Sequence, residues 1–138
     1  MPSRPAAFGA ACLALGTALI TAPGVTADPG DHTYVDHVAW AKWGDLSSLR
    51  VYPTDTARAL AHQPGSTAQA DQAWAEVLTL SPEADLPGMR EQFLCHWTFA
   101  ELAEPGKSSW NLEPWRPEVS PEVMLASGCN PGGSEEPF

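Results

Sequence analysis

Apolar side chains recur most regularly between Leu86 and Leu102, and this stretch is predicted to form the longest helix of the chain. On a period of about 3.6 residues, one narrow sector of that helix would face the core, and it holds Leu86, Met89, Phe93, Trp97 and Ala100. His96 falls inside the same sector, and Cys95 falls at its edge. One helix is therefore expected to supply the core face, a titratable side chain and a cysteine.

Before this helix, the pattern favours a β-hairpin. Residues 33–43 are rich in β-branched and aromatic side chains, and residues 46–53 continue with alternating polar and apolar positions. Gly44 and Asp45 stand between the two stretches and suit a tight turn. Two antiparallel strands are therefore predicted.

The remaining elements are short helices and one edge strand. Thr54 and Ser66 are placed to cap helices over residues 54–61 and 66–80, and Ser81 begins another helical turn. Residues 109–115 alternate as a strand, and the prolines beside them confine that strand to an edge of the sheet. A last helix is expected from Ser120 to about Gly128. The predicted fold is α+β, with a small antiparallel sheet packed on three to four helices.

Residues 1–27 have the composition of a secretory signal peptide. Arg4 precedes an apolar run from Ala6 to Ile20, and small residues lead to a cleavage position near Ala27. Cys12 lies within the run, but its surroundings do not favour a lipid anchor. We expect a secreted, extracellular protein with no stable membrane anchor, a single domain over residues 28–131 and a flexible tail over residues 132–138.

The charge balance narrows the range of partners. The chain has 17 acidic residues against 7 lysines and arginines, which gives a formal net charge of −10. Such a chain repels nucleic acid, and no basic cluster offsets the repulsion. Nucleic-acid binding is the function that the sequence disfavours most.

Cys95 and Cys129 are the two cysteines that follow the predicted leader. In an oxidising compartment an even pair indicates one disulfide. That bond would close a loop of about 35 residues and contribute roughly 3–4 kcal/mol by restricting the unfolded chain. The alternative is two thiols that are free or used separately.

Three blocks of sequence resemble a known family. They are residues 88–97 (GMREQFLCHW), residues 110–117 (WNLEPWRP) and residues 128–133 (GCNPGG). The chain is similar, from about Tyr34 to Gly133, to the small secreted actinobacterial proteins grouped as a domain of unknown function (number 2599). The resemblance implies secretion and a single domain, and it brings no activity, cofactor or catalytic residue.

His96 is the one candidate for catalysis. A histidine on an apolar face is desolvated, and beside a carboxylate it acts as a general base. Asp36, Glu91 and Glu113 are the possible partners, although Glu91 points to another side of the helix. The alternative is a core histidine whose ring is satisfied by a backbone carbonyl.

The sequence offers no pattern for a metal or a cofactor. The four histidines are dispersed, and neither the zinc-type spacing nor a calcium-loop pattern occurs. We therefore expect no metal and no cofactor.

The segment that follows the long helix is the candidate binding surface. Aromatic, amide and charged side chains alternate there, and prolines hold the backbone extended; the candidate residues are Trp110, Asn111, Glu113, Trp115 and Arg116. The alternative is that the tryptophans pack in the core and that Glu113 and Arg116 form an ion pair. Of the 6 tryptophans, Trp43 and Trp115 are expected to be the most exposed.

These features give three hypotheses for the function. The first is a secreted binding module, whose partner is an extracellular protein, peptide or glycan. The second is a small hydrolase-like enzyme that uses His96 and a carboxylate, and it requires a cleft that reaches the imidazole. The third is an extracellular protease inhibitor, for which residues 104–109 are the candidate loop.

Overall fold

The structure, a computed structural model, describes residues 32–133. The predicted leader and residues 134–138 of the predicted tail lie outside these residues. The elements are β1 (Val35–Trp43), β2 (Leu46–Pro53), α1 (Asp55–Ala61), α2 (Thr67–Leu80), the 3-10 turn η1 (Pro82–Ala84), α3 (Met89–Ala103), β3 (Trp110–Leu112) and α4 (Pro121–Ala126). In this part of the chain no helix has the length and apolar character that crossing a membrane requires.

The sheet is antiparallel, with the order β1-β2-β3, which confirms the predicted hairpin and edge strand. Leu49 pairs with Leu112 and Val51 with Trp110, so these four side chains share one face and are all buried. A shift in register between Val35 and His37 marks a bulge near the start of β1. The strand β3 has only three residues because Pro114 lies just beyond Leu112 and cannot donate to a ladder.

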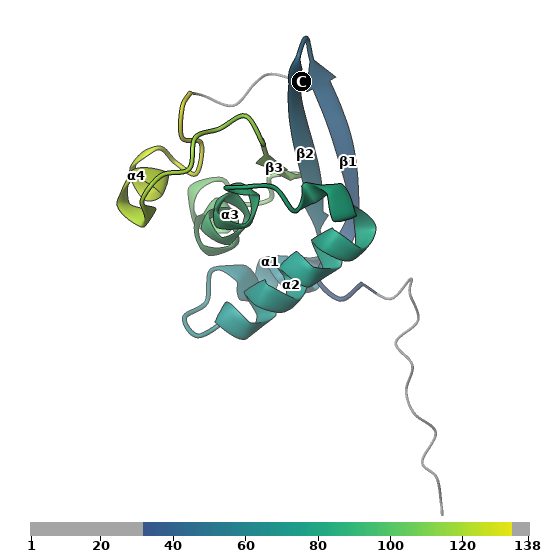
Figure 1. Ribbon diagram of the computed structural model, residues 1–138. Coiled ribbons are helices and arrows are strands. Elements are labelled where there is room, and N and C mark those ends of the chain that lie inside the picture. Colours follow the sequence, from purple (N-terminus) through teal and green to yellow (C-terminus); the bar gives the residue numbers. More distant parts are fainter. Residues whose placement is uncertain (1–31, 134–138) are drawn as a thin grey trace, which may run out of the picture.

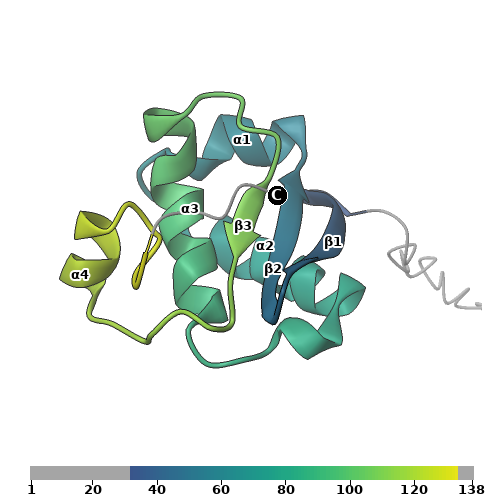
Figure 2. The same ribbon diagram turned by 90° about the horizontal axis from the view of Figure 1, so that it is seen from above.

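The helices α1, α2 and α3 cover the inner face of the sheet, and the tip of the hairpin extends beyond them (Figures 1 and 2). Aromatic rings fill the space between the layers. The ring of Phe93 lies 5.5 Å from that of Trp74 and 6.0 Å from that of Trp110, and Trp97 lies 5.8 Å from Tyr34, all between ring centroids. Edge-to-face and tilted arrangements of this kind suit the charge distribution of aromatic rings.

The long helix begins later than the apolar pattern predicts. It was expected to start at Leu86, but α3 starts at Met89, and Leu86 lies outside it and is exposed. Gly88 explains the difference, because its φ of 82° is left-handed and incompatible with a right-handed helix. The other core-face residues predicted for this helix are buried, and so is His96.

Side-chain caps fix the short helices and the first strand. Thr54 accepts a hydrogen bond from the backbone N–H of Ala57, as its position predicts. Ser66 precedes α2 without capping it, because its hydroxyl accepts from the indole N–H of Trp97 and donates to a carbonyl of α1. Glu76 of α2 accepts three backbone N–H groups at the start of β1, at 2.8 to 3.2 Å.

The helix α4 lies on the outer side of α3, away from the hairpin (Figures 1 and 2). Ser120 caps it, and the predicted disulfide between Cys95 and Cys129 joins its end to α3. Cys95, Cys129 and Met124 form an apolar cluster separate from the main core, with Phe99 and Val119 packed against it. The structure therefore has two apolar cores, and the disulfide belongs to the smaller one.

Candidate functional site

The segment predicted as a binding surface is mostly interior. Trp110, Asn111, Glu113 and Arg116 are all buried, and Trp115 is half-buried. Trp110 therefore packs in the core, as the alternative interpretation predicts, and its ring contacts those of Phe93 and Trp97. Trp43, at 55% exposure, is the more exposed of the two tryptophans predicted to be accessible.

Glu113 and Arg116 form the ion pair that the sequence offered as an alternative. The side chains of both are fully buried, and Arg116 Nε lies 2.8 Å from Glu113 Oε2. Ser48 donates to the other carboxylate oxygen, and the side chain of Gln92 bonds both the N–H and the carbonyl of Glu113. Because the charges are paired and hydrogen-bonded, the bend after β3 tolerates their burial.

Arg116 also fastens the end of the described chain. Its Nη1 donates to the carbonyls of Pro131 and Gly133, and its guanidinium lies 4.4 Å from the centre of the Trp115 ring. This single side chain therefore links β3, the bend and the residues that follow the disulfide. Its role in the described structure is to position them.

His96 is 5% exposed, and its ring is held in place from within α3. Nδ1 lies 2.8 Å from the carbonyl of Gln92, and since a carbonyl only accepts, Nδ1 carries a proton. The three predicted carboxylate partners lie in different surroundings. Asp36 bonds His37, Glu113 bonds Arg116, and Glu91 lines a different pocket. Residues 32–133 contain no group of three or more potential metal ligands.

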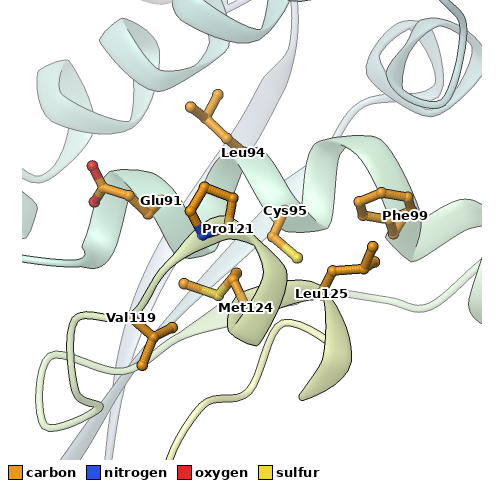
Figure 3. A pocket seen from close by; sticks show the side chains of 8 residues that line it. All are labelled: Glu91, Leu94, Cys95, Phe99, Val119, Pro121, Met124 and Leu125. Carbon is orange, nitrogen blue, oxygen red and sulfur yellow. The ribbon is translucent and has the colours of Figure 1, made fainter.

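The most apolar pocket lies between α3 and α4 (Figure 3). Its volume is about 320 Å³, and it is lined by Glu91, Leu94, Cys95, Phe99, Val119, Pro121, Met124 and Leu125. The side chains of Cys95 and Met124 face one another across its middle, and Phe99 and Leu125 lie at one end (Figure 3). Glu91 lies at the other end. Pockets of this size and composition suit the apolar part of a ligand.

This site was not recognised from the sequence. A signal was present, since Glu91, Leu94, Cys95 and Phe99 follow a helical spacing on a second side of α3. The spacing of one helix does not tell which short segment lies against that side. The structure supplies the second wall, from Val119 to Leu125.

A second pocket adjoins the apolar one and is more polar. It has a volume of about 370 Å³, and it is lined by His96, Phe99, Ala100, Ala103, Glu104, Lys107, Leu125, Gly128, Cys129 and Asn130. Phe99 and Leu125 line both pockets, so this pair forms the border between them. The cleft that the hydrolase hypothesis requires is thus present beside His96, although the ring itself is nearly covered.

Carboxylates lie near the apolar pocket. Glu91 lines it, and Glu122 follows the lining residue Pro121. Hydrogen bonds from the backbone N–H of Glu122 and from the side chain of Ser120 lower the pKa of Glu122 below its ordinary value of 4.5. Both hydrogen bonds favour the charged form of Glu122, and the carboxylate of Glu91 at the pocket itself is unfavourable for anions.

The loop proposed for protease inhibition, residues 104–109, is largely exposed. Glu101 accepts a hydrogen bond from the N–H of Gly106, and Arg58 donates to the carbonyl of Ser108. These bonds tie the loop to α1 and α3. The disulfide lies between Cys95 and Cys129, outside the loop itself.

Comparison with known proteins agrees with the resemblance seen in the sequence. The model of a family described as a protein of unknown function (DUF2599) matches residues 35–132. Uncharacterised proteins of Mycobacterium tuberculosis and Mycobacterium bovis are each 61% identical over 110 residues, which cover 80% of this chain and 74% of the relative. An uncharacterised protein of Mycobacterium leprae is 49% identical over 102 residues, or 74% of this chain and 82% of the relative. No solved structure gives a significant match. With the fold, the disulfide and these relatives in agreement, the chain belongs to the DUF2599 family.

Proposed function

We propose that this protein is a secreted binding module that holds an apolar group of an extracellular ligand between α3 and α4. The observation that carries the proposal is the pocket of about 320 Å³, whose lining is apolar except for Glu91. Burial of apolar surface contributes about 25 cal/mol per Å², so a chain or side chain that fills the pocket gains affinity without further polar contacts.

The walls of the pocket support this use. Met124 and Phe99 belong to the smaller apolar cluster, and the disulfide ties that cluster together. A thioether adapts its shape to different apolar groups, while the covalent link keeps the two walls at a fixed separation. The disulfide and the leader-like residues 1–27 together favour an extracellular setting.

The ligand is expected to carry no negative charge beside its apolar group. Glu91 and Glu122 repel anions at this side of the molecule, and the chain has a net charge of −10. An extracellular protein, peptide or glycan fits this site if it bears an apolar chain or side chain.

The proposal is tested with N-phenyl-1-naphthylamine, a neutral probe that fluoresces when it leaves water for an apolar site. The oxidised, exported protein should bind it saturably. Leu125→Asp places a charge at the wall of the pocket and should weaken binding by about tenfold or more, because the probe cannot compensate a desolvated carboxylate.

Leu102→Asp is the matched control. Leu102 is 61% exposed and Leu125 is 52% exposed, and Leu102 lines neither of the pockets beside α3 described above. The control should bind the probe as the wild type does. Absence of saturable binding by the wild type, or equal loss in both variants, would contradict the proposal.

A further inference from the structure

The polar pocket beside His96 and the apolar pocket are neighbours of unlike polarity, with Phe99 and Leu125 at their border. We infer that the ligand is an amphiphile, with its apolar chain in the pocket of Figure 3 and an uncharged, hydroxyl-bearing head in the pocket beside His96. This inference rests on the proposed function and specifies the class of ligand.

The polar groups of the second pocket indicate the chemistry of the head. An imidazole, a carboxylate, an ammonium and a carboxamide line it, from His96, Glu104, Lys107 and Asn130. Each of them forms hydrogen bonds with hydroxyl groups, which both donate and accept. Apolar lining from Ala100, Ala103 and Phe99 leaves surface for the carbon skeleton of such a head.

The side chain of Asn130 indicates that the head of the ligand carries a hydrogen-bond donor. Its Nδ2 donates to the carbonyl of Gly128, but its Oδ1 is buried and accepts no hydrogen bond within residues 32–133. A buried acceptor without a donor lowers the stability of the free protein. A ligand that supplies an O–H or N–H donor removes this penalty and therefore binds more tightly. Asn130 is one of the residues that line this pocket.

Charge in and around the two pockets disfavours an anionic head. Lys107 Nζ lies 3.9 Å from a carboxylate oxygen of Glu104, so the two charges in this pocket offset each other. The carboxylates of Glu91 and Glu122, near the apolar pocket, act against an anionic amphiphile. The ring of His96 is fixed by its bond to Gln92 and serves as a rigid wall.

Three amphiphiles with the same eight-carbon alkyl chain separate the possibilities: octyl β-glucoside, octyl sulfate and octyltrimethylammonium. Each amphiphile is titrated, below its own critical micelle concentration, into the oxidised protein with bound naphthylamine probe, and displacement of the probe gives its affinity. The glucoside is expected to bind about tenfold more tightly than the other two, because it alone brings hydroxyl donors to the polar pocket.

Asn130→Leu removes the orphan acceptor and keeps a side chain of similar size. It should lower the affinity for octyl β-glucoside by about fivefold to tenfold and leave octyltrimethylammonium, which has no donor, unchanged. Unchanged binding of the naphthylamine probe, which needs only the apolar pocket, shows that the variant is folded.

The outcomes distinguish this inference from the proposed function. If the three amphiphiles bind equally well, or if Asn130→Leu weakens the glucoside and the ammonium alike, the head-group site is wrong while the apolar pocket stands. If neither the probe nor any amphiphile binds the wild type, both proposals are wrong.

Discussion

Arg116 shows how one side chain organises a bend and a chain end at the same time. Its guanidinium forms a fully buried pair with Glu113 and also donates to the carbonyls of Pro131 and Gly133. Removal of one member of such a pair leaves the other charge buried and uncompensated. Loss of this arginine should therefore lower the free energy of unfolding by more than loss of an ordinary surface ion pair does.

Arg116→Met should lower the free energy of unfolding by roughly 3–5 kcal/mol, because the carboxylate of Glu113 stays buried without its cation. Urea denaturation followed by tryptophan fluorescence measures the change. Arg90→Met is the control, since its pair with Asp71 is about half exposed, and it should cost no more than about 1 kcal/mol. Equal effects of the two substitutions would contradict this account of Arg116.

At the residue scale, the sequence offered the pairing of Glu113 with Arg116 but not its surroundings. Two residues three positions apart, beside prolines, suggest an ion pair by proximity alone. The partners Ser48 and Gln92 come from β2 and α3, far away in the chain. Local spacing carries no information about such contacts, and so the burial of the pair was not predictable.

At the scale of elements, the caps were predictable because a cap is a local device. Thr54 and Ser120 each precede a helix and accept from its first turn. Ser66 occupies the same kind of position, but its hydroxyl accepts a hydrogen bond from the indole N–H of Trp97 instead of capping the helix. The start of α3 was missed because periodicity continues through Pro87 and Gly88, while the left-handed backbone of Gly88 breaks the helix.

The pocket wall formed by α4 depends on its first turn, where Ser120 and Glu122 lie. Ser120→Ala removes a hydrogen bond that lowers the pKa of Glu122, so this pKa should rise toward 4.5. The folded-state pKa is depressed, so Glu122 stabilises the fold at pH values above its ordinary pKa. This contribution is lost as the pH falls through the folded-state pKa.

Carbon-13 NMR of the Glu122 carboxyl group measures the shift directly. Ser127→Ala is the control, because Ser127 lies at the other end of α4 and bonds the carbonyl of Met124. It should leave the titration of Glu122 unchanged. A Glu122 midpoint at or above 4.5 in the wild type, or no response to Ser120→Ala, would refute this description of the turn.

At the scale of the whole molecule, a sheet-and-helix core carries a second, smaller cluster on its outer side. The first joins β2, β3, α2 and α3 through buried aromatic and aliphatic side chains, and the second joins α3 to the segment around α4. The disulfide closes the smaller cluster, and Arg116 connects the bend after β3 to Pro131. The outer segment packs against α3, and the apolar pocket lies between the two.

The most direct test of a ligand site between α3 and α4 is a map of the methyl groups by NMR, with the oxidised wild-type protein and N-phenyl-1-naphthylamine. The resonances of Leu94, Val119, Met124 and Leu125 are predicted to shift as the probe is added, while those of Leu86 and Leu102 stay in place. Shifts at Leu86 or Leu102 with no change at the four pocket residues would contradict the account.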